Sequence, residues 1–230
     1  ESTGAFEVWW VGHSKGALVQ YLFQATGHAL APRVTALVAI GSPGTVRFQR
    51  RFLRWLVPPL SLWARVVGDV PLSRAIVLLT PLAHLTRWLG RPIDTLVREN
   101  DGASLGRLFA SIFADVNRGV VEQMLRWVAH PDGALVAMDG RRYDEGFGRL
   151  RMPLYLLAGA ADRLVPPAAV AYVRDRVSST DVTFEVVGVA GGASHDYGHG
   201  DLVLGARAPE DVFARVVRWL GARAGGAPIV

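Results

Sequence analysis

The sequence predicts an α/β fold with a mainly parallel sheet, flanking helices and a long inserted helical segment. Short apolar segments alternate along the chain with segments of helical periodicity. Each candidate strand is apolar along its length, which is typical of parallel strands covered by helices on both faces. The middle of the chain differs, because it is dense in Arg and Trp and broken by prolines. We therefore expect an α/β core, residues 1–44 and 150–230, and a helical cap, residues 45–149.

Four segments are predicted to be strands. The first, Phe6–Val11, is mostly aromatic and β-branched and is bounded by glycines. The second, Val34–Ile40, is closed by the turn sequence Gly41–Gly44. The third and fourth are Pro153–Gly159 and Val182–Val189.

Three core segments are predicted to be helices. Gly16–Ala25 carries its apolar residues on one face, and Gly27 ends it. Ala168–Val177 follows the third strand. Asp211–Ala222 is amphipathic and closes the core with an inward face, which consists of Val212, Val216, Trp219 and Leu220.

Composition excludes several classes of protein. Half of the 230 residues are hydrophobic, so the chain can bury a core. The absence of cysteine excludes disulfides, cysteine-ligated zinc and a thiol nucleophile, and it suits a reducing compartment without establishing one. The net charge of +5 is interspersed with acidic residues and forms no dense basic run, so nucleic-acid binding is not indicated. No apolar run approaches the roughly 20 residues of a membrane-spanning helix.

The first strand leads into Gly12–Gly16, which fits G-x-S-x-G between a strand and a helix. In that context the motif predicts a nucleophile elbow, in which the chain reverses sharply and holds Ser14 above the sheet in a strained conformation. Gly12 and Gly16 are expected to remove Cβ atoms that would collide across this turn. The helix that follows points its N-terminus toward a developing oxyanion. An ordinary strand-turn-helix containing one Ser and two Gly is the alternative.

The chain also supplies partners for a serine nucleophile. A hydroxyl needs a base to take its proton, and the base needs an acid to orient it. In this architecture the chain order is Ser, then Asp or Glu, then His. Asp162 follows the third strand directly, at the edge where the carboxyl ends of the strands meet. Two histidines, His195 and His199, follow the fourth strand. The order predicts a Ser-His-Asp triad that begins with Ser14.

On these segments the chain resembles the α/β-hydrolase superfamily, and its cap and C-terminal half are similar to the acid lipase and esterase branch. The likeness rests on Tyr197–Gly205, which is similar to that branch's segment around the catalytic His, and on Asn117–Trp127 in the late cap. The segment around Asp162 resembles the superfamily's acid loop. The likeness spans Phe6 to Leu220, although residues 45–102 match only in being helical.

The resemblance implies a role for each site residue. Ser14 would be the nucleophile, Asp162 the orienting acid and His199 the base, while Lys15 would supply one oxyanion-hole donor through its backbone N–H. It implies a serine hydrolase that cleaves carboxylic esters through an acyl-enzyme and needs no cofactor. The apolar cap favours hydrophobic acyl groups on a small-molecule ester or lipid. A non-catalytic binding module, or an acyltransferase or polyester-processing enzyme on the same triad, are the alternatives.

Two assignments compete within the last loop. His195 is a second candidate for the base, but the resemblance places the base between Tyr-Gly and x-Asp-Leu, which favours His199. His195, Asp196, His199 and Asp201 also have the side chains that metal ions bind. They lie in one short loop without a second cluster elsewhere, so a metal site is disfavoured. His13, next to the nucleophile, is interpreted as a packing residue.

The aromatic residues of the cap allow two interpretations. They form the cap's own core, or some of them line an acyl-chain pocket. One helical face also combines aromatic and arginine side chains, which suits transient contact with an anionic lipid interface. The aromatic set is Phe48, Phe52, Trp55, Trp63, Trp88, Phe109, Phe113 and Trp127, and the mixed face consists of Phe48, Phe52 and Trp55 beside Arg47, Arg50, Arg51 and Arg54.

The nucleophile motif comes very early in the chain. In the superfamily the elbow follows about the fifth strand, and the second oxyanion donor comes from a loop after the third. We therefore expect the sequence to be an N-terminally truncated piece of a longer hydrolase, with Phe6–Val11 as an exposed apolar edge. Loss of one oxyanion donor lowers turnover by about 10² to 10³, so we expect weak or no activity from this piece alone.

Overall fold

The computed structural model describes residues 5–47, Leu62 and residues 116–224. Of the aromatic and arginine residues singled out in the predicted cap, the structure describes Arg47 and Trp127. The predicted lipid-contact face and the remaining aromatic set stay predictions, because they lie outside the described residues. These are Phe48, Arg50, Arg51, Phe52, Arg54, Trp55, Trp63, Trp88, Phe109 and Phe113.

Four strands form one parallel sheet in the order β1-β2-β3-β4, which confirms the predicted sheet. The first strand lies two residues later than predicted, because its pairing runs from Val8 opposite Val34 to His13 opposite Ile40. The fourth ends two residues early, where the short helix Val189–Gly191 replaces it. The strands are β1 (Val8–His13), β2 (Val34–Ile40), β3 (Leu154–Gly159) and β4 (Val182–Val187).

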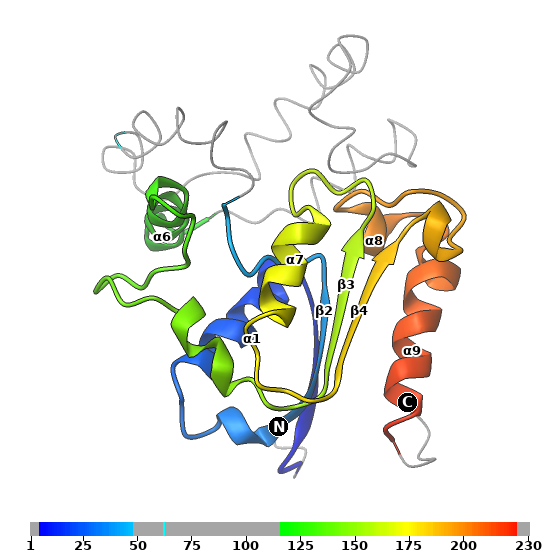
Figure 1. The fold of residues 1–230 in the computed structure, drawn as a ribbon, viewed down its shortest axis with the longest axis horizontal. Helices are drawn as coiled ribbons and strands as arrows, with labels where there is room; N and C mark the ends of the chain where they lie inside the picture. Colours follow the sequence, from blue (N-terminus) through cyan, green and yellow to red (C-terminus); the bar gives the residue numbers. More distant parts are fainter. Residues whose placement is uncertain (1–4, 48–61, 63–115, 225–230) are drawn as a thin grey trace.

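Helices cover both faces of this sheet. In Figure 1, α1 and α7 lie on one side, and α9 lies on the other. Alternating residues of β2 reach the two sides: Leu37 packs in the cluster that contains α1 and α7 residues, and Val38 packs in the cluster that contains α9 residues. The helices are α1 (Lys15–Ala25), α6 (Arg118–Ala129), α7 (Pro167–Arg174), α8 (Asp201–Leu204) and α9 (Ala214–Gly221).

The predicted closing helix is present but not regular. A π-helical turn, Pro209–Phe213, runs directly into α9. The four residues predicted to face inward, from Val212 to Leu220, are all buried. Among the described residues, no helix combines the length and apolar character needed to cross a membrane.

The outer strand β1 is exposed. Its residues Val8–Val11 are each 36–50% exposed, and Phe6 just before it is 77% exposed. The prediction of a sheet covered on both faces therefore holds for the central strands β2 and β3 but not for β1. The expected exposed apolar edge is present along this strand.

Polar contacts organise the described residues from Asn117 to Asp144, which fall in the late part of the predicted cap. Asn117 caps α6, because its Oδ1 accepts a hydrogen bond from Gly119 N at 2.9 Å. After this helix the chain returns through Arg142, which donates two hydrogen bonds to the buried carboxylate of Asp144, and Tyr172 OH on α7 donates a third at 2.8 Å. These contacts fix the segment that carries α6 against the sheet.

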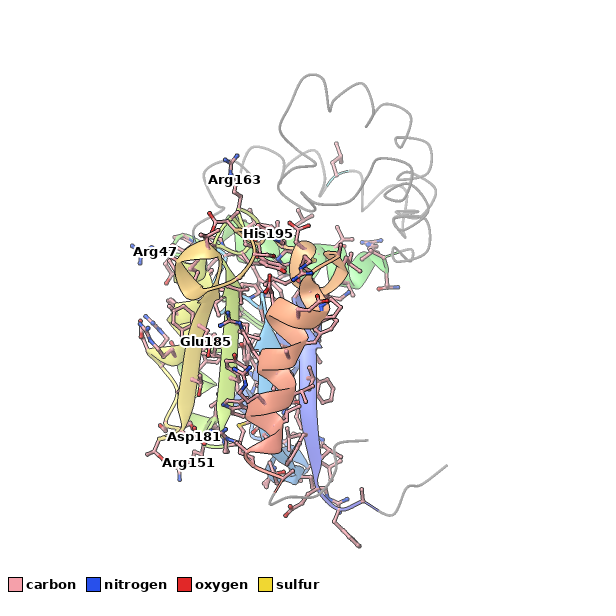
Figure 2. The ribbon with its side chains drawn as sticks, turned by 90° about the vertical axis from the view of Figure 1, so that its right-hand side faces the viewer. Arg47, Arg151, Arg163, Asp181, Glu185 and His195 are labelled. Carbon is pink, nitrogen blue, oxygen red and sulfur yellow. The ribbon has the colours of Figure 1, made fainter. Side chains whose placement is uncertain are left out.

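The loops that carry the predicted acid and base lie at one end of the molecule. In Figure 2, Arg163 of the loop after β3 and His195 of the loop after β4 lie at the same end. Asp181 and Arg151, which precede strands, lie at the opposite end. This is the expected result of parallel strands, whose carboxyl ends meet at one edge of the sheet.

Candidate functional site

Ser14 occupies a strained turn between β1 and α1. Its φ of 51° and ψ of −118° make it the one non-glycine residue with positive φ in the described part of the chain. Such a conformation costs of order 1–3 kcal/mol and persists only when its surroundings impose it. Here Ser14 N donates a hydrogen bond to Ile40 O of β2 at 2.8 Å. Ser14 is therefore held in a strained turn between a strand and a helix.

The two motif glycines play different parts. A Cβ on Gly12 would lie 2.5 Å from Ala17 N and 2.6 Å from Gly16 C, so only glycine lets the start of α1 approach the end of β1 this closely. A Cβ on Gly16 would meet nothing within 4 Å. The prediction that Gly16 also prevents a collision is thus wrong, because its Cα faces open space. Its carbonyl instead accepts a hydrogen bond from Trp10 Nε1 at 3.0 Å.

Asp162 is held by the loop that follows β3. Its Oδ1 accepts a hydrogen bond from Val165 N at 2.7 Å, and its side chain is completely buried. The loop is joined to the histidine loop, because Ala161 N donates to Tyr197 O at 2.9 Å. Gly159 makes this approach possible, since a Cβ there would lie 2.4 Å from the same Tyr197 oxygen.

His199 connects the acid to the serine. Its Nδ1 lies 2.8 Å from Asp162 Oδ2, and its Nε2 lies 2.9 Å from Ser14 Oγ. A carboxylate oxygen accepts, so Nδ1–H is the donor, and Nε2 is left to accept the serine proton. His199 is only 6% exposed, so these hydrogen bonds act in a medium of low dielectric constant. The three predicted residues are brought into one hydrogen-bonded chain.

The other candidate residues of the last loop, His195, Asp196 and Asp201, make contacts outside this hydrogen-bonded chain. The ring of His195 stacks on Tyr197 with centroids 4.0 Å apart, and its Nδ1 lies 2.9 Å from Ser194 Oγ. Asp196 accepts from Val189 N, and Asp201 accepts from Gly198 N, both at 3.0 Å. These carboxylates hold loop backbone. In the part of the chain that the structure describes, no three His, Asp or Glu side chains gather as a metal site would require.

Lys15 is the first residue of α1. The first four N–H groups of a helix have no partner within the helix, and they point toward its positive end. Its backbone N–H is therefore placed beside Ser14, where the resemblance expects an oxyanion-hole donor.

A residue not predicted to act in the site, His13, contacts the base. Its Nε2 donates to the backbone O of His199 at 3.0 Å, and the two rings lie 4.7 Å apart. Burial, and to a lesser extent the adjacent His199 ring, lowers the pKa of His13 to about 4. His13 is therefore neutral near pH 7 and supports the histidine loop. No local sequence signal indicates this contact, because its partner lies 186 positions away.

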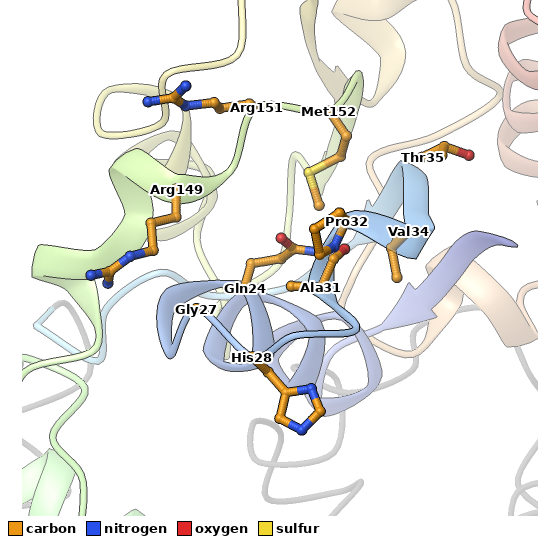
Figure 3. Close-up of a pocket in the computed structure, with 10 residues that line it drawn as sticks. All are labelled: Gln24, Gly27, His28, Ala31, Pro32, Val34, Thr35, Arg149, Arg151 and Met152. Carbon is orange, nitrogen blue, oxygen red and sulfur yellow. The ribbon is translucent and has the colours of Figure 1, made fainter. Parts of the chain in front are cut away.

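A pocket of about 620 Å³ opens beside the serine. Ser14 and Lys15 form part of its wall, and the remaining wall comes mainly from apolar residues of α1, α6 and the acid loop. A second pocket of about 500 Å³ lies at the other end of α1 (Figure 3). There Arg149 Nη1 donates to Ala25 O at 2.7 Å, and Gln24 Nε2 donates to Ala31 O at 2.9 Å. Those two side chains hydrogen-bond to backbone oxygens. Ser14, Asp162 and His199 do not line that pocket.

Comparisons with known proteins identify the fold. No family model and no curated protein matches the chain. A monoacylglycerol lipase from Paleococcus ferrophilus matches with a TM-score of 0.58 and 14% identity, over 95% of this chain and 69% of that one. The structure of Rv0554 from Mycobacterium tuberculosis matches at 0.55 and 18%, over 94% and 65%. An esterase from Exiguobacterium antarcticum matches at 0.55 and 12%, over 91% and 65%.

These matches show the α/β-hydrolase fold, as predicted. The chain spans about two thirds of the length of the matched structures. At identities below 20% the likeness concerns the fold, and any activity must be argued from the site itself.

The two motif glycines give a matched pair of variants. We expect Gly12→Ala to lower the free energy of unfolding by about 1–3 kcal/mol, because its Cβ meets backbone atoms that cannot move aside. Gly16→Ala should leave the free energy of unfolding unchanged or raise it by up to about 1 kcal/mol, because Ala is the better helix former. Urea unfolding of both variants measures this, and equal losses in the two would contradict the difference in packing.

His13 should make the protein sensitive to acid. In the unfolded chain a histidine titrates near pH 6.5, whereas the pKa of His13 in the folded protein is lowered to about 4 by burial. Between these values only the unfolded chain binds the proton, so acidification favours unfolding. His13→Gln keeps an N–H donor without titrating. Between pH 7 and pH 4.5, we expect the free energy of unfolding of the variant to fall by about 2 to 3 kcal/mol less than that of the original protein.

The measurement is urea unfolding of both proteins at the two pH values. Gln in place of His13 leaves every other titrating group present, so the difference between the two pH dependences isolates this position. Identical pH dependences would mean that His13 is protonated in the folded protein.

Proposed function

We propose that the protein is a serine hydrolase that cleaves carboxylic esters through an acyl-enzyme, with Ser14 as nucleophile, His199 as base and Asp162 as the orienting acid. The observation that carries this proposal is the pair of hydrogen bonds that joins the three side chains at a strained elbow. Strain at a non-glycine residue marks functional sites when the surrounding structure imposes it. The solved structures named as a lipase and an esterase share the fold and support this class of reaction.

Each proton in the proposed reaction has a defined route. Ser14 Oγ attacks the ester carbonyl carbon while its proton passes to His199 Nε2. The carbonyl oxygen becomes an oxyanion, which accepts a hydrogen bond from the backbone N–H of Lys15. The bond to the alcohol oxygen then breaks, and Nε2 returns the proton to the departing alkoxide. A water molecule, deprotonated by the same Nε2, then attacks the acyl-enzyme. As the bond to Ser14 Oγ breaks, Nε2 returns the proton to that oxygen, which releases the acid and restores the serine.

Asp162 has an electrostatic task in this scheme. Its buried carboxylate accepts from His199 Nδ1 and from Val165 N, so it fixes the imidazole tautomer and stabilises the imidazolium formed in each step. An acyltransferase would use the same acyl-enzyme but pass the acyl group to an alcohol instead of water. Product analysis with and without an added alcohol separates the two reactions.

Labelling with a fluorophosphonate tests the nucleophile directly. We expect one covalent adduct on Ser14 and none in Ser14→Ala, because only an activated serine hydroxyl displaces fluoride. His199→Ala and Asp162→Asn should slow p-nitrophenyl acetate hydrolysis by about 10⁴-fold, since removing either partner disables the base. Labelling is the more sensitive measurement, because it needs one reaction at the serine and no turnover.

His195→Ala is the control for the base. It removes the neighbouring histidine of the same loop and should leave labelling unchanged. The hydrolase proposal fails if Ser14 does not label in a folded protein, or if Ser14→Ala labels equally well. Thermal denaturation of each variant checks that it is folded.

A further inference from the structure

The pocket beside Ser14 has three apolar walls. Leu18 and Leu22, one helical turn apart, form the wall from α1, and Leu164 of the acid loop adds a second. The third wall is the face of α6 that carries Met124 and Trp127. Spacings of three, four and seven residues along α6, beginning at Val120, place these side chains on one face of the helix.

The polar side chains of the α6 wall are engaged, whereas the charged side chain of Lys15 belongs to the lining beside Ser14. Trp127 Nε1 donates to Val136 O at 2.8 Å, and Gln123 Nε2 donates to the same oxygen. Asn117 Oδ1 accepts from Gly119 N at the start of α6. Along the α6 wall, a polar group on a ligand would therefore lose hydrogen bonds to water with little replacement, which is costly, whereas a hydrocarbon chain would gain. The walls favour an aliphatic occupant.

The position of His199 indicates which half of an ester would enter this pocket. His199 Nε2 must protonate the departing alkoxide, so the alcohol half lies on the histidine side of Ser14. The pocket is lined by Ser14 and Lys15 but not by His199. It therefore extends from the serine away from the base, on the side left for the acyl half.

On the premise of the proposed ester hydrolase, we infer that the groove between α1 and α6 is the acyl-chain site, and that it takes extended aliphatic acyl groups. The chain would begin at Ser14 and run along α1 toward Leu22. Ser14 and Leu22 are eight positions apart, which corresponds to about 12 Å along a helix axis. Met124 on α6, which is 49% exposed, lies on the opposite wall and sets the width available to the chain.

Two series of esters test this inference. Lengthening the acyl chain of p-nitrophenyl esters from acetyl to octanoyl should raise kcat/KM by about fourfold for each methylene that is buried. Lengthening the alcohol of alkyl acetates should have little effect, because that half leaves on the histidine side. Equal effects in the two series, or none with acyl length, would overturn the acyl assignment.

A matched pair of α6 variants locates the site. Met124→Trp fills the groove and should lower the ratio of kcat/KM for octanoyl over acetyl ester by about tenfold. Ala129→Trp adds the same ring at an exposed residue that does not line the pocket, and it should leave the ratio unchanged. Thermal denaturation confirms that both variants fold. The inference fails if the two variants behave alike.

Binding to Ser14→Ala separates this inference from the proposed function. Without catalysis, calorimetry should show octanoate binding more tightly than butyrate, and Met124→Trp should reduce that difference. Chain-dependent binding without any hydrolysis by the original protein would keep the apolar site and reject the hydrolase. Hydrolysis without chain dependence would reject the site and keep the hydrolase. Neither binding nor hydrolysis would reject both.

Discussion

The hydrogen bond from Ser14 N to Ile40 O holds the whole site to the sheet. It joins the turn after β1 to the end of β2, and at 2.8 Å it balances part of the strain in the Ser14 backbone. Without a Cβ at Gly12, α1 can start directly above the strand and fix the turn from the other side. Backbone contacts therefore fix the position from which the Ser14 hydroxyl extends.

The remaining side chains reach Ser14 through connected loops. The acid loop and the histidine loop share the hydrogen bond between Ala161 and Tyr197, which links the backbone segments that carry Asp162 and His199. His13, at the end of β1, donates a hydrogen bond to the backbone oxygen of His199 and so adds a contact between the first strand and the histidine loop. A neutral donor suits this role, because a second positive charge beside the imidazole would oppose its protonation during a reaction.

Much of this arrangement could be predicted from the sequence, where signals are local. Val34–Ile40 was identified with its observed bounds, because a buried parallel strand reads as an unbroken apolar run. The strained turn at Ser14 could be predicted because its residue types and flanking elements occur together in the chain. The order of Ser14, Asp162 and His199 followed from the architecture.

Other features had no local signal. The sequence pattern could not show that Gly16 faces open space while Gly12 is packed, because both are glycines in one motif. It could not choose between His195 and His199 by residue type, since only the fold brings one ring to the serine. The contact of His13 and the pocket between α1 and α6 join segments far apart in the chain, so they depend on tertiary packing.

The pairing of β2 with β3 has a consequence for how the site is held together. These strands are neighbours in the sheet, although residues 41–153 separate them along the chain. Ser14 belongs to the portion before that insertion, while Asp162 and His199 belong to the portion after it. A single protease cut within the insertion would leave two fragments joined by the strand ladder and the shared core. The site is in this sense a noncovalent assembly of two pieces, of the kind exploited in split-enzyme complementation.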